Sequence, residues 1–393
     1  MRRIPVLLLI GCSLVWLCGC PAVTVDVTSA GGAPDGTFTG PPDDGALTNT
    51  PDDVAPIDAP HDVTPTDPPD DTLPSSSFIR AFGKELVVGA GASFKAIQLR
   101  GINVQSFWLL SPPDLSNPFF NDDNDQGVPI ASLIPTRFDA TVVSNIASLG
   151  ANVIRNAISF RQFEDNANPY VYKPEGWALL DRQIALAKEA GVYTIIDMHV
   201  PPGGLQGVVG SSARLWEEPE LQARTKALWR AIAGRYRDEP WVAGYDLINE
   251  PMPTRNPGQW TTFARELVDS IRQIDVNHLI IVEEVLAVVD AQGNYPAIDP
   301  DEPWLPKMAD DNVLYDFHFY KPLDFVGQGR PENGLGDDGQ VYPDETHEYR
   351  DDAGTLVGVR NKAYLRSLID DKLAFQRMYN VPMNVGEFSP SRL

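Results

Sequence analysis

The sequence predicts an α/β fold, a parallel (β/α)8 barrel, and three observations support this prediction. From Phe78 onward, short apolar runs of strand length alternate with longer segments that have the apolar spacing of helices. Such alternation indicates right-handed β-α-β units and a parallel sheet. The chain has neither a G-x-G-x-x-G nor a G-x-S-x-G motif, which disfavours the open sheets of dinucleotide-binding proteins and serine hydrolases.

Seven apolar runs are assigned to the strands of this barrel. They lie near residues 99–103, 152–155, 193–198, 242–248, 279–282, 313–317 and 383–386. Helices are expected near residues 139–149, 177–190, 219–236, 257–273 and 359–379, with a short helical piece near 304–308. Before the first strand, residues 85–98 have the Gly-rich centre that is typical of a β-hairpin.

The sequence provides no eighth βα unit at the C-terminal end of the predicted barrel. The residues after Glu387 are too few for a helix of ~10 residues and a strand of ~5. We therefore interpret residues 78–393 as a C-terminally incomplete barrel domain, and we expect a truncated sequence rather than a natural seven-stranded protein. Open edges on the first and seventh strands would favour aggregation.

The charge and cysteine content of the chain exclude several classes of protein. Its 393 residues include 54 Asp and Glu against 31 Lys and Arg, a formal net charge of −23. Nucleic-acid binding needs a basic surface, so no nucleic-acid partner is expected. The 3 cysteines are too few for a disulfide-rich scaffold or a structural zinc site of several thiolates.

The first 20 residues have the features of a secretory signal. Arg2 and Arg3 precede an apolar run at 4–17, which is shorter than the ~20 residues that span a bilayer. The tetrad L-C-G-C at 17–20 resembles the lipobox of bacterial lipoproteins, which implies that Cys20 is acylated and becomes the first mature residue. The alternative is an ordinary signal peptide. We expect residues 1–20 to be a lipoprotein signal peptide, with the lipid as the only membrane contact, at the cell surface or outer membrane.

Residues 21–77 are expected to form a disordered linker rich in Pro and Asp. They contain no Lys, Arg or Glu, and Phe38 is their single aromatic residue. Such a segment buries too little apolar surface to offset the entropy of ordering, and its like charges keep it extended. The linker would let an anchored domain reach a polymer beyond the cell surface.

Polar residues follow the apolar core of five predicted strands. They are Arg155, His199, the pair Asn249 and Glu250, His318 with Tyr320 just beyond, and Glu387. In a parallel barrel the carboxyl ends of the strands meet at one mouth, where active sites lie. Each residue alone has another explanation, such as a salt bridge or a helix cap, but five in register are not expected from packing.

Two of these residues, Glu250 and Glu387, suggest glycoside chemistry. Hydrolysis of a glycosidic bond needs an acid at the leaving oxygen and a carboxylate at the anomeric carbon. Arg155 beside one of the two would keep that one ionised and favour it as the nucleophile. Asn249 is suited to hydrogen-bond the sugar 2-hydroxyl, a contact that strengthens in the transition state.

These segments together resemble glycoside hydrolase family 5, the cellulase family. The matching motifs are R-G-I-N at 100–103, N-V-I-R at 152–155, D-M-H at 197–199, D-L-I-N-E-P at 246–251, F-H-F-Y at 317–320 and V-G-E-F at 385–388. The resemblance covers residues 78–393 and implies a TIM barrel with a retaining double displacement and no cofactor. It implies that Glu250 is the acid/base and Glu387 the nucleophile. It also implies a sugar subsite next to the cleaved bond, lined by Arg155, His199, Asn249, His318 and Tyr320.

Two tryptophans, Trp108 and Trp216, fall in loops that follow strands on the mouth side. Exposed aromatic rings in such loops stack on sugars, so both are candidate substrate-binding residues, with packing in the core as the alternative. The acidic runs at 121–125 and 336–339 lack the spacing of a calcium loop, so no metal site is expected.

The leading hypothesis is a surface-anchored, monomeric, retaining β-glycoside hydrolase that cleaves a β-linked glucan as an endoglucanase does. A β-mannanase, an exo-β-1,3-glucanase and a glycolipid glycosidase remain open, because the resemblance implies one catalytic set for all of them. A hypothesis of another class is a non-catalytic carbohydrate-binding surface lipoprotein, which is expected if the truncation is natural.

Overall fold

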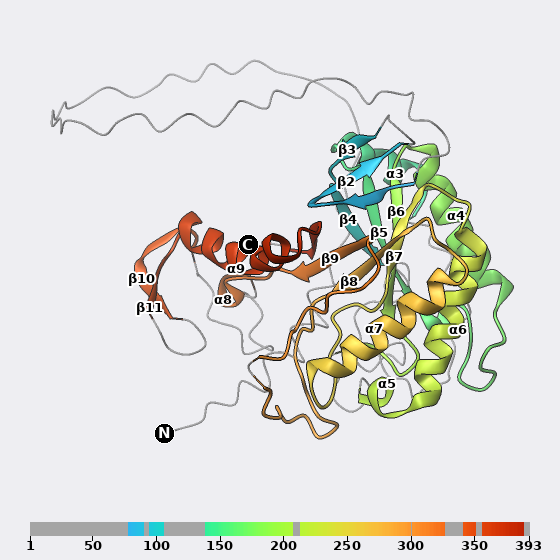
Figure 1. Ribbon diagram of the computed structural model, residues 1–393. Coiled ribbons are helices and arrows are strands. Elements are labelled where there is room, and N and C mark those ends of the chain that lie inside the picture. The colour runs from blue at the N-terminus through green and yellow to red at the C-terminus, as the bar shows by residue number, and fades with distance from the viewer. Residues whose placement is uncertain are drawn as a thin grey trace, which may run out of the picture. The chain divides into compact units, whose positions relative to one another are not determined.

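Seven parallel strands form the central sheet of the protein, for which we describe a computed structural model (Figure 1). The structure describes residues 78–89, 94–105, 138–206, 213–299, 301–326, 341–350 and 356–388. The predicted signal peptide with Cys20, the predicted linker and Trp108 all lie outside the described residues.

The strands of this sheet lie where the apolar runs predict them. They are β4 (Gly101–Gln105), β5 (Val153–Ser159), β6 (Tyr193–Val200), β7 (Val242–Asp246), β8 (Leu279–Glu283), β9 (Val313–His318) and β12 (Met383–Glu387). Their order in space follows the chain, and every neighbouring pair is parallel. All residues of β5, β6, β7 and β8 are buried, because a parallel sheet is covered on both faces.

The sheet curls into a barrel. β4 and β12 are at opposite ends of the strand order, yet Asn103 Nδ2 on β4 donates a hydrogen bond to the carbonyl oxygen of Gly386 on β12 at 3.2 Å. Six flat strand spacings would separate these two strands by about 29 Å. The predicted parallel barrel is therefore confirmed. In the described part of the chain, no eighth strand pairs with the edge of β4 or β12.

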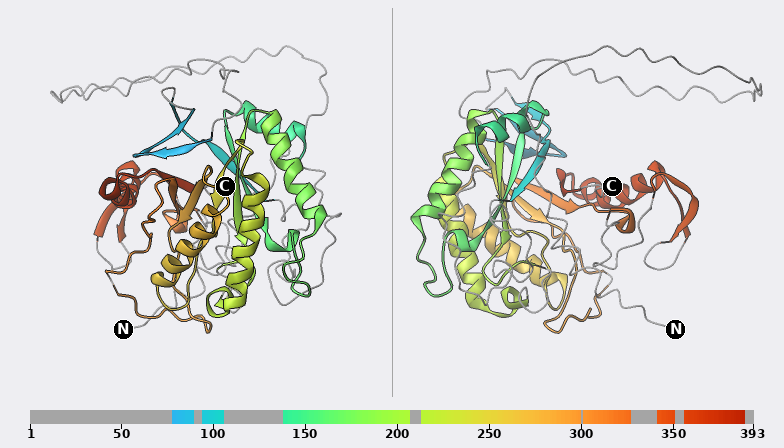
Figure 2. Two further views of the ribbon diagram at one scale, coloured as in Figure 1. Left: turned by 45° about the vertical axis from the view of Figure 1, so that its right-hand side comes forward. Right: turned by 180° about the vertical axis from the view of Figure 1, so that it is seen from behind.

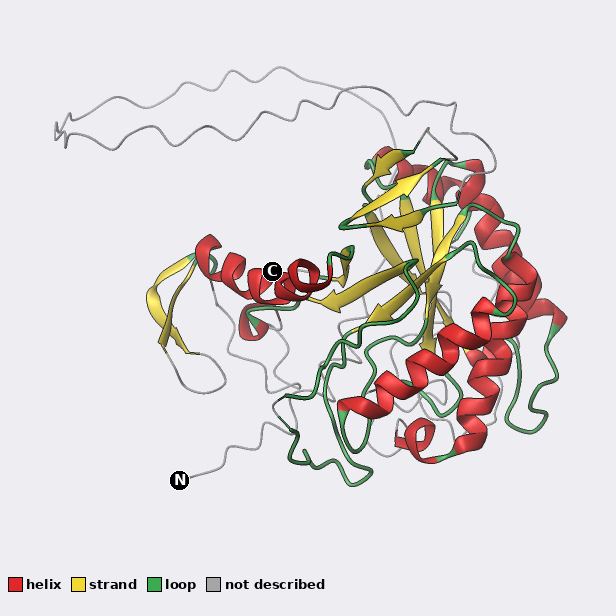
Figure 3. Cartoon of the chain, in the orientation of Figure 1, coloured by secondary structure: helices red, strands yellow, loops and turns green. Residues whose placement is uncertain are grey.

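Helices cover the outside of the sheet (Figure 3). The longer ones are α3 (Ala140–Ser148), α4 (Pro174–Glu189), α6 (Pro219–Tyr236), α7 (Pro257–Arg272) and α9 (Lys362–Tyr379), and the shorter ones are η2 (Phe160–Gln162), α5 (Ala213–Glu217) and α8 (Leu323–Val326). α4, α6 and α7 each begin with a proline, whose missing N–H would have no partner at a helix start. For this reason α4 begins at Pro174, before the predicted start at Trp177.

Two helix predictions need correction. The short helix expected near residues 304–308 is wrong, because the segment is a loop. Pro306 has no N–H to donate and disfavours a helical conformation at the preceding residue. The helix expected from residue 359 begins instead at Lys362, because residues 356–360 form a strand. None of the described helices is both long enough and apolar enough to cross a lipid bilayer.

Two small antiparallel sheets accompany the barrel (Figure 2). One contains β1 (Arg80–Phe82), β2 (Glu85–Val88) and β3 (Lys95–Ile97), and the other contains β10 (Asp344–Arg350) and β11 (Leu356–Arg360). β2 and β3 confirm the predicted hairpin, whereas β1 was not predicted. The first sheet packs Ile79, Leu86 and Val88 against residues at the starts of the barrel strands. It therefore covers the amino-terminal end of the barrel, opposite to the predicted site.

Two buried tryptophans connect the helices to the carboxyl ends of the strands. Trp229 of α6 donates its Nε1–H to the Leu247 carbonyl oxygen at 3.0 Å, just after β7. Trp260 of α7 donates in the same way to the Glu283 carbonyl oxygen at 2.9 Å, at the end of β8. These bonds hold the ends of β7 and β8 against the rigid helix layer.

Candidate active site

The structure brings the polar residues of five strands together at the carboxyl end of the barrel. His199 lies in β6, Asn249 and Glu250 directly follow β7, His318 ends β9, and Glu387 ends β12. Arg155 differs from the prediction that it ends its strand, because β5 continues to Ser159. Its side chain points into the barrel from within β5 and is long enough to reach the other residues, as the distances below show.

Glu387 is held by hydrogen bonds on both carboxylate oxygens. Arg155 Nη1 donates to Oε1 at 2.9 Å, and the Tyr320 hydroxyl donates to Oε2 at 2.8 Å. Burial alone would raise the pKa of Glu387. The positive charges of His318 and Arg155 outweigh burial and lower the pKa of Glu387 to about 2. Glu387 is therefore a carboxylate at any ordinary pH.

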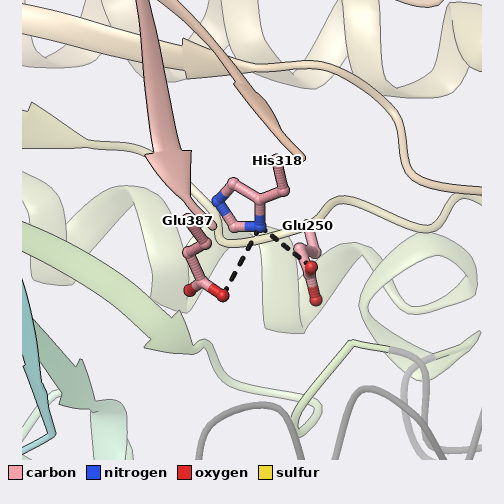
Figure 4. A group of neighbouring side chains, drawn as sticks. All are labelled: Glu250, His318 and Glu387. Atoms are coloured by element: carbon pink, nitrogen blue, oxygen red, sulfur yellow. Dashed lines mark hydrogen bonds and ion pairs between the residues drawn. The ribbon is translucent and has the colours of Figure 1, made fainter. Parts of the chain in front are cut away.

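Glu250 faces Glu387 across the imidazole of His318 (Figure 4). His318 Nδ1 lies 2.9 Å from Glu250 Oε1 and 3.7 Å from Glu387 Oε2. One oxygen of each carboxylate and one ring nitrogen of His318 lie within 4.8 Å of one another. The two carboxyl groups are thus close enough to act on a single bond of a ligand.

The backbone of Glu250 is strained. Its φ is 46°, in the left-handed region that residues other than glycine rarely adopt. Pro251 follows and disfavours the ordinary helical alternative. The carboxyl group of Glu250 is consequently aimed by an unusual turn rather than by the regular geometry of β7.

Arg155 is the central cation of the site. Its guanidinium lies within 3.0 Å of four buried carboxylates: Asp197, Asp246, Glu283 and Glu387. It also donates from Nη2 to Asn249 Oδ1 at 2.9 Å, which fixes the orientation of that amide. Burial acts to lower the pKa of Arg155, but the attraction of the four carboxylates raises it well above the usual range.

His199 belongs to the same network. Its Nδ1 lies 2.8 Å from Asp197 Oδ2, and only 1% of its surface is exposed. Asp197 Oδ2 also contacts Arg155, at 3.0 Å. The imidazole is therefore oriented by a carboxylate that is itself oriented by the central arginine.

Four buried carboxyl groups of the site were not among the predicted residues: Asp197, Asp246, Glu283 and Asp316. Burial raises the pKa of Asp246 to about 7 and raises that of Glu283 and Asp316 as well. Asp246 therefore carries a proton in a substantial fraction of the molecules near neutral pH. The signal that would have found Glu283 is the same as for Glu250, because it directly follows the apolar run L-I-I-V.

Asp316 supports the strand that ends in Glu387. Its Oδ1 accepts a hydrogen bond from the backbone N–H of Gly386 at 2.9 Å, and its Oδ2 accepts one from Asn384 Nδ2 at 2.6 Å. A Cβ on Gly386 would lie 2.6 Å from Asp316 Oδ1, so only glycine fits beside this carboxylate. Asp316 thereby fixes the residue just before Glu387.

Trp216 does not lie where a sugar could stack on it. Its indole is 2% exposed and packs edge-on against Trp260 and Phe263. Its Nε1 donates to Gln206 Oε1 at 2.9 Å, and the same oxygen accepts from the backbone N–H of Met252 at 3.3 Å. The prediction of a sugar platform is wrong for Trp216, which instead packs beneath the loop that follows Glu250.

Two groups of side chains in the described residues have a spacing that suits a metal ion. The first is Glu250, His318 and Glu387, and the second is Asp197, Asp246 and Glu283. In the second group the guanidinium of Arg155 already contacts all three carboxylates. The first group is hydrogen-bonded within itself and coincides with the paired carboxylates.

The chain is similar to known proteins over much of its length. The model of the cellulase family, glycosyl hydrolase family 5, matches residues 124–391. The chain belongs to the cellulase family. The family match and the structure thus agree on a parallel barrel.

Several proteins that are similar to this chain are named as glycosidases. The chain is 34% identical to a β-xylosidase of Phanerodontia chrysosporium over 191 residues, which are 47% of this chain and 38% of that protein. It is 30% identical to endoglucanase C of Acetivibrio thermocellus over 190 residues, 47% of this chain and 51% of that one. The chain thus spans about half or less of these relatives. A crystal structure of a glycoside hydrolase has the same fold, with a TM-score of 0.54, 18% identity and coverage of 75% and 79%.

Proposed function

We propose that this protein is a retaining β-glycoside hydrolase that uses Glu387 as its nucleophile and Glu250 as its acid/base. The observation that carries the proposal is the close pair of carboxyl groups, with oxygens within 4.8 Å. Retaining enzymes hold these groups about 5–5.5 Å apart, whereas inverting enzymes need about 6.5–9.5 Å to admit a water. Membership of the cellulase family supports the same assignment.

The proposed reaction has two steps. Glu387, kept ionised by its positive neighbours, attacks the anomeric carbon while Glu250 donates a proton to the departing oxygen, so that the glycosidic C–O bond breaks and a glycosyl ester forms. Glu250 then removes a proton from water, which attacks the same carbon and releases the sugar with Glu387 free again. Arg155, His199, Asn249 and Tyr320 would bind and orient the sugar beside the cleaved bond.

Two substitutions test the assignment. Glu387→Gln should abolish turnover and any glycosyl-enzyme intermediate, because an amide is a poor nucleophile. Glu250→Gln should slow the cleavage of glycosides with poor leaving groups strongly, by roughly 100-fold or more, yet spare activated aryl glycosides that need no acid. Equal loss on both kinds of substrate would contradict the role given to Glu250.

A β-linked glucan is the substrate class that we propose. The endoglucanase relative supports it, and the β-xylosidase relative makes an aryl β-xyloside a necessary second probe. Sugar release should be measured from β-1,4-glucan, mannan, β-1,3-glucan, a glycolipid and the aryl β-xyloside. Release from none of them, together with sugar binding that survives Glu387→Gln, would favour a non-catalytic carbohydrate-binding protein.

We also propose that Cys20 carries a lipid that anchors the protein outside the cytoplasm. The L-C-G-C tetrad after the apolar run is the support for this proposal. Cys20→Ser should move the protein from the detergent phase to the aqueous phase in a partitioning assay, whereas Cys12→Ser, within the apolar run, should not. Detergent partitioning that survives Cys20→Ser would contradict the proposal.

A further inference from the structure

Glu283 lies at the junction of the acid/base, the central arginine and the histidine between the two carboxylates. It is the last residue of β8 and is 2% exposed. Its Oε2 accepts a hydrogen bond from the backbone N–H of Glu250 at 2.7 Å, and its Oε1 accepts one from Arg155 Nη2 at 2.7 Å. Both carboxylate oxygens are therefore committed to neighbours in the site.

The hydrogen bond between Glu283 and Glu250 is made by the backbone N–H of the strained residue itself. A non-glycine residue in the left-handed region costs on the order of 1–3 kcal/mol and persists only where its surroundings hold it. Glu250 has a φ of 46°, and Glu283 binds the N–H of that same residue. Losing this bond would leave a buried N–H without an acceptor, which is costly, so the bond is well suited to offset the strain.

Glu283 also acts on the side chain of Glu250, through His318. The imidazole has Nδ1 at 2.9 Å from Glu250 Oε1 and Nε2 at 3.4 Å from Glu283 Oε2. Burial acts to lower the pKa of His318, but the surrounding carboxylates, Glu283 foremost, raise it well above the usual range. Glu283 therefore helps to keep His318 positively charged, and His318 in turn holds the carboxyl group of Glu250.

The position of Glu283 is itself fixed from outside the barrel. Its backbone carbonyl accepts a hydrogen bond from Trp260 Nε1 of α7 at 2.9 Å, and Trp260 is completely buried. The carboxyl group thus projects into the site from a strand end that is held against the helix layer. Groups on rigid elements position their partners more accurately than groups on loops.

We propose that Glu283 is the positioning residue of the acid/base: it holds the backbone of Glu250 in its left-handed turn and orients its carboxyl group through His318. This inference rests on the proposed function of Glu250. The competing explanation is that Glu283 only balances the charge of Arg155. Three other carboxylates, Asp197, Asp246 and Glu387, already lie within 3.0 Å of that guanidinium, so charge balance does not require a fourth.

The test is the dependence of kcat/KM on the leaving group, measured on aryl β-glycosides whose phenols differ in pKa. In Glu283→Gln, one of the two accepting oxygens becomes an NH2 group, so either the Glu250 N–H or Arg155 Nη2 loses its acceptor. We expect a loss of roughly 10- to 100-fold on poor leaving groups and at most about 3-fold on a dinitrophenyl glycoside, because small misplacements of a catalytic group cost about this much. The kcat/KM values of the wild type should depend on the phenol much less steeply.

Glu284→Gln is the matched control. Glu284 is the next residue in the chain, and its carboxylate binds Lys372 at 2.6 Å instead of the site. This variant should leave the dependence on the leaving group unchanged. In the double variant of Glu250→Gln with Glu283→Gln, we expect no further steepening beyond Glu250→Gln alone, because both changes remove one function.

A loss that is equal for all leaving groups, or one that adds fully to that of Glu250→Gln, would overturn the proposal. If Glu283→Gln does not fold, Glu283→Asp keeps the charge, shortens the reach and should show the same selective loss. Failure of both variants to fold would show that Glu283 serves the whole fold and would also overturn it. A normal Glu283→Gln profile beside a selective Glu250→Gln profile refutes this inference alone, whereas an unselective Glu250→Gln profile refutes the proposed function.

Discussion

At the scale of single residues, the site is defined by an excess of buried carboxyl groups over cations. Six of them are at most 6% exposed: Asp197, Asp246, Glu250, Glu283, Asp316 and Glu387. Burial raises the free energy of every unpaired carboxylate, so protons stay on the groups with the weakest positive neighbours. The position of Arg155 and His318 beside Glu387 therefore keeps that carboxyl group ionised.

This excess predicts how stability changes with pH. Burial raises the pKa of Asp246 to about 7, against an unfolded value of about 3.9. Between these two values the folded protein holds a proton that the unfolded chain releases, so the free energy of unfolding should fall as pH rises, by up to about 1.4 kcal/mol per pH unit.

The variant Asp246→Asn isolates this contribution. Its amide oxygen can still accept from Arg155 Nε, which lies 2.8 Å from Asp246 Oδ2, but the group no longer titrates. Urea unfolding at pH 5, 6 and 7 should show a shallower decline for Asp246→Asn than for the wild type. The exposed Asp238→Asn is the control. Parallel curves for wild type and Asp246→Asn would contradict the raised pKa.

At the scale of elements, the close approach of a helix to its neighbour depends on whether a glycine lies at the contact. Gly176 lies in the first turn of α4, and a Cβ there would be 1.8 Å from the Gln162 carbonyl oxygen in η2. Gly234 in α6 is different, because the nearest atom to its Cβ would be Ile274 Cγ2 at 3.9 Å. A side chain at position 176 would therefore clash with a neighbouring element, whereas position 234 has room for one.

Alanine substitutions at these glycines should change stability in opposite directions. Gly176→Ala should destabilise the protein by roughly 1–3 kcal/mol, because α4 must move away from η2. Gly234→Ala should stabilise it by about 0.5–1 kcal/mol, because alanine restricts the unfolded chain and favours the helix. Thermal unfolding of both variants measures the difference. A neutral Gly176→Ala would show that α4 and η2 are not in tight contact.

At the scale of the whole molecule, the small sheet that covers the barrel and the residues of the proposed reaction lie at opposite ends of the barrel. The small sheet β1–β3 packs its apolar residues on the amino-terminal ends of the strands, and the paired carboxylates lie at the carboxyl ends. Ile79, just before β1, is completely buried there, whereas Phe82 of β1 is 70% exposed. Changes at the amino-terminal end should therefore affect folding without affecting the reaction.

Ile79→Ala tests this separation. Loss of a buried isoleucine should cost about 2–5 kcal/mol of unfolding free energy, while KM and the dependence on the leaving group stay at wild-type values. Phe82→Ser, on the exposed side of the same small sheet, should change stability by no more than about 0.5 kcal/mol. A changed KM in folded Ile79→Ala would show that the two ends of the barrel are coupled.

The sequence by itself determined the order of strands and helices and the residues that face the mouth of the barrel. Apolar runs of strand length define β4 to β9 and β12, and the polar residue after each run identified Glu250, His318 and Glu387. Such signals are local, since strand length, side-chain alternation and turn chemistry all depend on neighbouring residues. Where a strand ends is less strongly encoded, and for this reason Arg155 was expected at the end of β5 and lies within it.

Only the tertiary structure decided which side chains meet. Asp246 and Glu283 touch Arg155 from strands far apart in the sequence, because the curvature of the barrel turns all three toward one axis. Trp216 has the sequence position of a sugar-binding residue, yet its ring packs against α7. Contacts of this kind depend on how the strands curl and how the helices pack over them. The pattern of residues along the chain does not predict these contacts. The contacts nevertheless determine the charge of the carboxyl groups in the site.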